Sequence, residues 1–445
     1  MSPRPLFRFC SVLLLAACDD QIVSPPAAEA APEEGPKLTF GTPQYDGANA
    51  AAVDQWGYVY VAGRTDGSLD GPHQGKADFF VRKYHPTGDV IWANQFGTHL
   101  NDWANGIAVD TDGNVYVVGQ TEGSLAGSRG GLDAFVRKYD TNGVLQWTRQ
   151  YGTPFNANDY ASAVAVSPDG SAVYIVGTSI YNGQPTGSLS KYDSDGVLVS
   201  HILWGHVNGA AVNFTGVAVD PLGHVYVVGY TAGSLALCCP VGGIDAFIWK
   251  FDASILVAIW LQQFGTTGDD HAYAVAVDLD GNPIIVGATL VADQSRGGGK
   301  ADWNAALWTY RHDGLPMTFS HFGSNASDRA YAVSVNTFNE FFVVGVTDGA
   351  LQGSSAGASD VFVRAYSAGS QPLQPLWTRQ FGTPADDRAF AVAASGDVSD
   401  PDAIRSRQVY IAGATAGTLV GANRGRYDAF LRRLDGIGNV SWTDQ

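Results

Sequence analysis

Carboxylates recur in this sequence at places where a cation could bind. Six aspartates each stand shortly before an Ala- and Val-rich segment, and these candidate binding residues are Asp46, Asp102, Asp159, Asp270, Asp328 and Asp387. Carboxylate oxygens are the ligands that Ca²⁺ prefers, so the series predicts an acidic rim for a cation, with Ca²⁺ as the candidate ion, or for a basic partner. The alternative is that each aspartate accepts hydrogen bonds from its own turn, and its regular recurrence favours that alternative. No other cofactor is expected.

A second feature with chemical potential is the adjacent pair Cys238-Cys239, which is absent from the corresponding place in every other repeat. In an exported protein these thiols could oxidise. A strained ring between the two neighbours, two free thiols and an intermolecular bridge all stay open. We expect this loop to be specialised.

Other motifs give weaker evidence for a functional site. The segments 110–114 and 278–282 (DTDGN and DLDGN) resemble calcium loops, but they lack a third ligand position and a closing Glu. A tight Asp-Gly turn explains both. The histidines show no zinc-ligand spacing, and we assign no catalytic residue.

The N-terminus is predicted to be a targeting segment. Residues 1–17 read as a lipoprotein signal peptide, with Arg4 and Arg8 before a short apolar stretch. Leu15-Ala16-Ala17-Cys18 resembles the bacterial lipobox, which predicts lipidation of Cys18; an ordinary signal peptide is the alternative. Residues 18–37, rich in Pro, Ala and acidic residues, read as a tether. The chain is therefore expected in the bacterial cell envelope, held to a membrane by its lipid alone.

The net charge narrows the classes of partner that the protein is expected to bind. The chain carries 26 Lys and Arg against 43 Asp and Glu, a formal charge of −17. So acidic a protein is repelled by phosphate backbones, which argues against nucleic-acid binding.

The candidate residues must be positioned by a repeated unit, because an aromatic-Gly marker recurs every 53 to 60 residues. Its seven copies are Phe40-Gly41, Phe96-Gly97, Tyr151-Gly152, Trp204-Gly205, Phe264-Gly265, Phe322-Gly323 and Phe381-Gly382. Each copy reads as four short strands separated by turn signals, with no helical period. Seven units of four strands predict an all-β fold, a single seven-bladed β-propeller over residues 38–445.

Side-chain size supports this interpretation. The predicted inner segments contain no aromatic residue, and they are 50–53, 106–109, 163–166, 216–219, 274–277, 332–335 and 391–394. Tyrosines enter in the second strands and tryptophans in the last, as expected for blades that widen outward. Each second strand ends in Gly, which we attribute to a close approach of another backbone. The segment 38–42 is expected to meet the C-terminus beside the last blade.

The units resemble the SBBP repeat of bacterial exported proteins and, more distantly, the NHL repeat. The resemblance rests on the FGT marker and on the AVAVD, VYVVG and DAFVRKY strands, and it implies the propeller fold but little about function. The predicted function is a binding, adhesion or envelope scaffold module that uses its top face, where the first strands begin, and its long loops. The partner would be a protein or a carbohydrate. The alternative is an enzyme, a hydrolase or lyase, at the top mouth of the central channel.

Overall fold

The computed structural model describes residues 40–127, 130–153, 157–181, 183–205, 210–235, 241–292, 301–370, 372–396 and 407–445. The chain divides into Met1–Glu34 and Gly35–Gln445, and all described residues belong to the second unit. The predicted signal peptide, Cys18 and the whole of the predicted tether (residues 18–37) lie outside the described residues. Nowhere in the described ranges does a helix of sufficient length and apolarity to cross a membrane occur.

Within these residues, 28 strands form seven four-stranded antiparallel sheets, which we number blade 1 to blade 7 in chain order. In every sheet, strands that are neighbours in sequence are neighbours in space. The first strands are β1 (Asp46–Val53), β5 (Asp102–Val109), β9 (Asp159–Val166), β13 (Val212–Val219), β17 (Asp270–Val277), β21 (Asp328–Val335) and β25 (Asp387–Ser395). The second strands are β2 (Val59–Thr65), β6 (Val115–Thr121), β10 (Ala172–Tyr181), β14 (Val225–Thr231), β18 (Pro283–Ala292), β22 (Glu340–Thr347) and β26 (Gln408–Thr415).

The outer half of each blade completes the sheet. The third strands are β3 (Asp78–Tyr84), β7 (Asp133–Tyr139), β11 (Gln184–Asp193), β15 (Asp245–Phe251), β19 (Ala301–Tyr310), β23 (Asp360–Ser367) and β27 (Asp428–Leu434). The fourth strands are β4 (Val90–Phe96), β8 (Leu145–Tyr151), β12 (Leu198–Trp204), β16 (Ala258–Phe264), β20 (Pro316–Phe322), β24 (Pro375–Phe381) and β28 (Val440–Asp444). The aromatic residue of each marker from Phe96 onward is thus the last residue of a blade.

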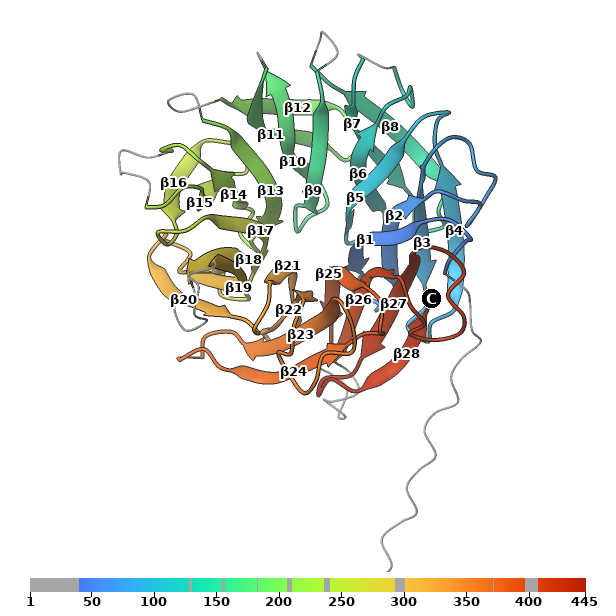
Figure 1. The fold of residues 1–445 in the computed structure, drawn as a ribbon. Coiled ribbons are helices and arrows are strands. Elements are labelled where there is room, and N and C mark those ends of the chain that lie inside the picture. Colours follow the sequence, from blue (N-terminus) through green and yellow to red (C-terminus); the bar gives the residue numbers. More distant parts are fainter. Residues whose placement is uncertain are drawn as a thin grey trace, which may run out of the picture. The chain divides into compact units, whose positions relative to one another are not determined.

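The sheets of this unit are arranged in a ring with the first strands innermost (Figure 1). Each first strand contacts the first strand of the next blade, and β25 contacts β1, so the ring is closed. The seven-bladed propeller with four strands per blade is confirmed.

The core consists of layers between neighbouring blades rather than a single centre. The layer between blades 1 and 2, for example, packs Tyr60 and Phe79 against Val117 and Phe135. Because each second strand is sandwiched between two such layers, β6 is buried at all but one position. This explains why second strands are apolar on both faces.

The first strands begin four residues before the segments predicted from sequence. In this additional half they carry aromatic residues, and the expectation of a hub without them was wrong there; these residues are Trp103, Tyr160, Phe214, Tyr273, Tyr331 and Phe390. The reason is a β-bulge that separates the two halves of each first strand. Only the half that follows the bulge lacks aromatic residues.

The bulge also explains the glycine near the end of every second strand. A Cβ on Gly119 would overlap the carbonyl oxygen of Trp103, the residue just before the bulged region in the paired strand. The same carbonyl approach occurs at Gly63, Gly177, Gly229, Gly287, Gly345 and Gly413. These glycines are architectural, as their recurrence indicates.

The two ends of the described unit meet where predicted. Phe40 is fully buried in the layer between blades 7 and 1, with Ala429 and Leu431. At the other end, the side chain of Gln445 accepts a hydrogen bond from the backbone N of Leu419 at 2.7 Å, as Gln95 does from Leu69 in blade 1 at 2.8 Å. The N-terminal marker therefore continues the last blade in space.

Candidate functional site

The six predicted rim aspartates are the first residues of their strands, and their exposed fractions are 0–1%. In blade 2, one carboxylate oxygen of Asp102 accepts hydrogen bonds from the backbone N and the hydroxyl of Thr98, at 2.6 and 2.9 Å. The equivalent donors are Thr42 for Asp46, Thr153 for Asp159, Thr266 for Asp270, Ser324 for Asp328 and Thr383 for Asp387. The carboxylates thus hold the turn between blades, and they do not form an exposed rim.

Each of these aspartates also approaches the third strand of the preceding blade, across the marker glycine. Between blades 1 and 2, a Cβ on Gly97 would overlap the carboxylate of Asp78 and lie 3.2 Å from that of Asp102. Asp78 in turn accepts a hydrogen bond from the side-chain amide of Gln95 at 2.8 Å. We call each such meeting place a junction.

The seven junctions are not equal. Five bring two aspartates together, and these pairs are Asp428 with Asp46, Asp78 with Asp102, Asp133 with Asp159, Asp245 with Asp270 and Asp360 with Asp387. The junction of blades 5 and 6 pairs Asn304 with Asp328. The junction of blades 3 and 4 has Thr186 and Val212 at the equivalent strand positions, so it contains neither carboxylate.

Burial of the junction carboxylates shifts their titration. Burial raises the pKa of Asp102, the charge of Asp78 adds to the increase, and hydrogen bonds from Thr121 and Thr98 oppose it. Burial is likewise the main cause of a raised pKa at Asp46, Asp270, Asp328, Asp387 and Asp428. Because their pKa values are raised in the fold, these groups make the free energy of unfolding depend on pH.

A different set of side chains surrounds the axis of the ring. The fourth residue of every first strand is the bulged residue, which has no partner in the second strand and stays partly exposed. We call these seven residues the inner ring: Asn49, Asn105, Ser162, Thr215, Tyr273, Tyr331 and Phe390. Most reach the first strand of the next blade.

The inner ring has a polar half in blades 1–4. The side-chain amide of Asn49 donates to the carbonyl of Ala104 at 3.0 Å, and that of Asn105 donates to the carbonyl of Ala161 at 2.9 Å. The hydroxyl of Thr215 donates to the carbonyl of Ala272 at 2.8 Å, across the boundary of blades 4 and 5. Hydrogen bonds from the inner ring therefore link blade 1 to blade 2, blade 2 to blade 3, and blade 4 to blade 5.

Blades 5–7 replace these hydrogen bonds with aromatic contacts. The ring centroids of Tyr273 and Tyr331 are 5.4 Å apart, and those of Tyr331 and Phe390 are 6.2 Å apart. The Nδ1 atom of His271 lies 3.2 Å from the hydroxyl of Tyr273. Burial lowers the pKa of His271 and raises the pKa of Tyr273 to about 12.

Arg329 stands beside this aromatic half. Its guanidinium lies 5.4 Å from the ring centroid of Trp303, and it adjoins Tyr273. Among the described residues it forms no ion pair, whereas Arg388 pairs with Asp386 at 2.7 Å. Arg329 therefore has charge to offer a ligand.

A cavity of about 330 Å³ opens in blades 2–4, within the size range of small-molecule sites. Three inner-ring residues line it (Asn105, Ser162 and Thr215), together with side chains that include Tyr160 and Tyr230. None of its lining residues carries a charge. The carboxylate-free junction of blades 3 and 4 lies within this same region.

A wider hollow of about 520 Å³ lies where blades 7 and 1 meet. Tyr45 and Tyr427 line it, with ring centroids 5.6 Å apart. Arg64 is also present there, but it is already paired with Asp66 at 2.7 Å. A second arginine of the lining, Arg426, is exposed and forms no ion pair among the described residues.

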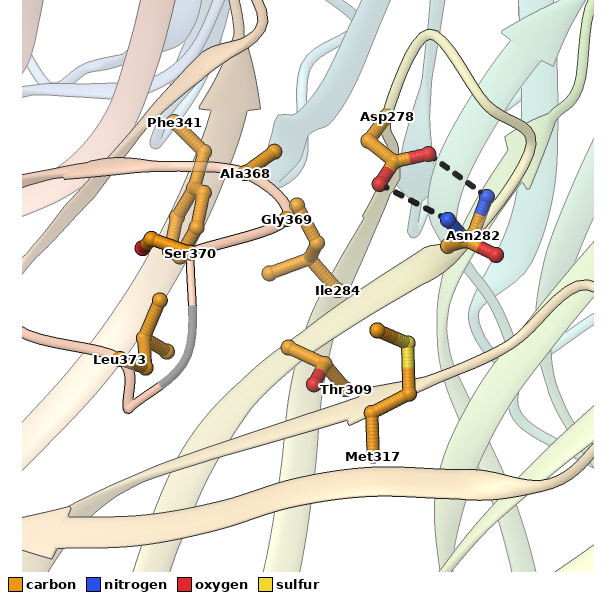
Figure 2. A pocket seen from close by; sticks show the side chains of 10 residues that line it. All are labelled: Asp278, Asn282, Ile284, Thr309, Met317, Phe341, Ala368, Gly369, Ser370 and Leu373. Atoms are coloured by element: carbon orange, nitrogen blue, oxygen red, sulfur yellow. Dashed lines mark hydrogen bonds between the residues drawn. The ribbon is translucent and has the colours of Figure 1, made fainter.

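The calcium-like segment 278–282 lies on the opposite face, beside a small pocket between blades 5 and 6 (Figure 2). Both carboxylate oxygens of Asp278 accept hydrogen bonds from Asn282, from its backbone N at 2.8 Å and its side-chain amide at 3.1 Å. The pocket holds only about 20 Å³, close to the room of one water molecule. Both oxygens of the Asp278 carboxylate are therefore occupied by hydrogen bonds within the turn.

Other predicted site residues are not placed. Cys238 and Cys239 lie outside the described residues, so the specialised loop stays a prediction. In the described part of the chain, no three side chains of His, Cys, Asp or Glu gather closely enough to hold a metal ion. The calcium hypothesis likewise stays a prediction.

Sequence reasoning missed the inner ring. A usable signal existed, since the fourth position of the first strands holds five residue types in seven copies, whereas the Ala- and Val-rich positions after it largely repeat. The bulge that turns this residue toward the axis carries no composition of its own. Only the recurring glycine opposite it, such as Gly119, records the distortion.

Comparison with known proteins agrees with the fold. A family model described as SBBP, beta-propeller repeat, matches residues 91–126, which run from β4 through β5 and β6. This segment is therefore similar to the SBBP β-propeller repeat, and the seven-bladed ring agrees with the fold that the similarity implies.

A curated relative and two solved structures are also similar. The regulatory protein FlaEY of Caulobacter vibrioides is 29% identical over 306 residues, which cover 56% of this chain and 31% of that protein. The match thus spans about a third of that relative's length. Polysaccharide lyase Uly1 aligns with a TM-score of 0.49 at 10% identity over 90% of this chain and 93% of Uly1. Sqt1 of Chaetomium thermophilum aligns with a TM-score of 0.47 at 14% identity, over 90% and 86%.

Proposed function

We propose that this SBBP propeller is a ligand-binding module whose site is the inner ring and the cavity beside it. One observation carries the proposal: the buried positions of the blades largely repeat, whereas the seven partly exposed inner-ring positions hold five residue types, Asn and Tyr twice each and Ser, Thr and Phe once each. A position that only supports the fold has reason to repeat in every copy. Divergence at seven positions around one axis is expected of a site that recognises something asymmetric.

The non-enzymatic reading has further support. A binding or scaffold role fits the long loops predicted on the same face, and the name of the relative FlaEY is that of a regulatory protein. The partner would be a protein or a carbohydrate of the envelope. Nucleic acid is not expected, because of the net charge of −17.

The test is binding of separated envelope fractions, polysaccharide and protein, to the full chain and to variants. We expect Tyr331→Ala with Phe390→Ala to abolish retention of one fraction. The matched control is Leu222→Ala, which removes an 85%-exposed side chain from a turn at the opposite end of the strands. Equal retention by the inner-ring variant and the control would refute the proposed site.

Export and anchoring are a separate part of the proposal. We infer that Cys18 receives lipid in a bacterial envelope, because the lipobox-like residues precede it directly. Labelling cells with a radioactive fatty acid should mark the protein, and Cys18→Ser should lose the label and release the protein from membranes. A labelled Cys18→Ser variant would contradict this.

A second candidate function is an enzyme at the same site. The observation that favours it is a group found in one blade pair alone, His271 with its Nδ1 atom 3.2 Å from the Tyr273 hydroxyl, beside Arg329. With its pKa lowered by burial, His271 is neutral at pH 7 and able to accept a proton. Turnover of a bound ligand that His271→Gln abolishes without weakening binding would favour the enzyme over the binding module.

A further inference from the structure

The inner ring and its neighbours differ in charge from the rest of the protein. At the second and fourth residues of the first strands no Asp or Glu occurs in any blade, although the chain carries 43 acidic residues. The second residues are Gly47, Trp103, Tyr160, Asn213, His271, Arg329 and Arg388. Carboxylates do flank this region, since Asp386 pairs with Arg388 and Asp269 lies near His271. Arg329, however, forms no ion pair among the described residues and can therefore bind an anion.

The cavity in blades 2–4 supplies a different chemistry. Its polar groups are amides and hydroxyls, and its largest rings are those of Tyr160, Phe214 and Tyr230. Within the described residues, no hydrogen bond engages the hydroxyls of Tyr160 and Tyr230 or the side chain of Asn213. Tyrosine rings with unused amide and hydroxyl groups suit the alternating C–H and O–H groups of a sugar ring. A carboxylate alone would leave most of these groups unused.

The two regions are joined by ring contacts. Tyr230, which lines the cavity, stacks on His271 with ring centroids 4.3 Å apart. His271 lies 5.1 Å from Trp303, over which the Arg329 guanidinium stands. A ligand that reaches from the cavity to Arg329 must therefore pass along several aromatic rings, which requires more than one sugar unit.

Resting on the proposed function, we propose that the ligand is an acidic oligosaccharide, with a neutral face in the cavity of blades 2–4 and a uronate carboxylate on Arg329. The guanidinium can bind that carboxylate through two parallel hydrogen bonds, and such pairs are among the stronger contacts in proteins. A peptide with acidic side chains would use Arg329 but would leave the hydroxyl-rich cavity unmatched. The charged and neutral contacts should thus be separable by mutation.

The experiment is calorimetric titration of the full chain with tetramers of galacturonate, glucuronate and mannuronate. Each acid is paired with its fully methyl-esterified form, which keeps the sugar rings and removes the charge. We expect at least one acid to bind about tenfold more tightly than its ester, a difference of about 1.4 kcal/mol. Tetraglutamate, which has the charge without the sugar, should bind no better than the esters.

Variants separate the two parts of the site. Arg329→Gln should bring the acid down to the affinity of its ester and leave the ester unchanged, whereas Tyr230→Ala should weaken both. Arg311→Gln, at an exposed arginine beyond the end of β19, is the matched control and should change neither. Melting curves of each variant check that it is folded.

The outcomes distinguish this inference from the proposed function. If no acid binds more tightly than its ester, or if Arg329→Gln leaves the difference intact, the acidic oligosaccharide is refuted. Tighter binding of tetraglutamate than of every saccharide would refute it in favour of a peptide. In each case the proposed function survives when Tyr331→Ala with Phe390→Ala still removes retention of an envelope fraction, and it fails with the inference when that retention is unchanged.

Discussion

The junctions of blades 1 and 2 and of blades 3 and 4 solve the same packing problem with opposite chemistry. The first buries Asp78 and Asp102 on either side of Gly97, and the second has Thr186 and Val212 at those places. Both retain the bulge and the glycine that accommodates it. The carboxylates are thus not needed to close the ring, which depends on apolar layers between blades. What they fix is the turn before each first strand, and where they are absent the uncharged cavity opens.

The largest effect is expected from placing a carboxylate in the junction that lacks one. Val212→Asp puts a charge at a fully buried position. The hydroxyl of the paired residue Thr231 already donates to the carbonyl of Ala211 at 2.9 Å. We expect the free energy of unfolding to fall by about 4 kcal/mol at neutral pH, as for an unpaired buried charge. Denaturant unfolding measures it, with Val212→Thr as the uncharged control. If both variants are equally stable, the two junctions are not chemically distinct.

The next largest difference in stability between the two junctions is expected when the marker glycine is replaced by alanine. Gly97→Ala forces a Cβ into the carboxylate of Asp78, at a cost of roughly 3 kcal/mol. No described atom lies within 4 Å of a Cβ at Gly205, in the junction of blades 3 and 4, so Gly205→Ala should be nearly neutral. Melting midpoints compare the two, and a similar decrease in both would show that the carboxylates are not the obstacle.

Removing one junction carboxylate should cost somewhat less. Asp102→Ala leaves the buried backbone N of Thr98 without its acceptor, which should lower stability by about 2 kcal/mol. Asp102→Asn retains an acceptor oxygen and should recover at least half of that loss. Denaturant unfolding of the two variants decides this, and equal losses would mean that Thr98 does not depend on Asp102.

Acidic pH should stabilise the propeller modestly. The junction aspartates have raised pKa values in the fold, so the folded state takes up protons at a higher pH than the unfolded chain does. Their stabilising contribution is complete below the ordinary pKa of 3.8 and is lost as the pH rises through the folded pKa. Burial raises the pKa of Asp444 to about 6, which sets the upper end of this range.

From about pH 7 to about pH 5 we therefore expect a gain on the order of 1 kcal/mol, seen as a higher melting midpoint. His271, whose pKa is lowered, opposes the gain because the folded state must resist its protonation. Asp387→Asn, which removes one of the carboxyl groups with a raised pKa, should reduce the slope. A midpoint that only falls on acidification would contradict the prediction.

The smallest expected effect is that of calcium. If the junction carboxylates serve their turns alone, adding Ca²⁺ or a chelator should leave the melting midpoint unchanged within error. A rise with Ca²⁺ that Asp102→Asn abolishes would instead support the cation-binding rim.

The fold could be predicted from sequence because the residues that form the apolar layers recur in every copy of the repeat. Tyr60, Tyr116 and Tyr226 recur in the second strands, and all three are fully buried between blades. Repetition averages out the ambiguity of any single short strand. The extent of the first strands could not be predicted, since Trp103 lies before a bulge and Tyr331 is itself a bulged residue, and both break the expected progression of side-chain size.

The candidate site was hidden for the complementary reason. The aspartates attracted attention because they recur, yet Asp46 and its equivalents are buried parts of turns. Arg329, His271 and Tyr230 come from three consecutive blades and are far apart in sequence, so no spacing rule connects them. Their association depends on the order of blades around the axis, which becomes visible only when the ring is assembled.

The bulge at the fourth residue of each first strand has a practical consequence for engineering. Because Tyr273 and its six counterparts have no partner in the sheet ladder, exchanging one of them removes no backbone pair from a sheet. At Asn49, Asn105 and Thr215 the exchange also removes a side-chain hydrogen bond to the next blade. The propeller thus offers seven adjustable positions on an unchanging frame. Libraries restricted to these positions could retarget the protein while sparing the interlocked sheets that keep it folded.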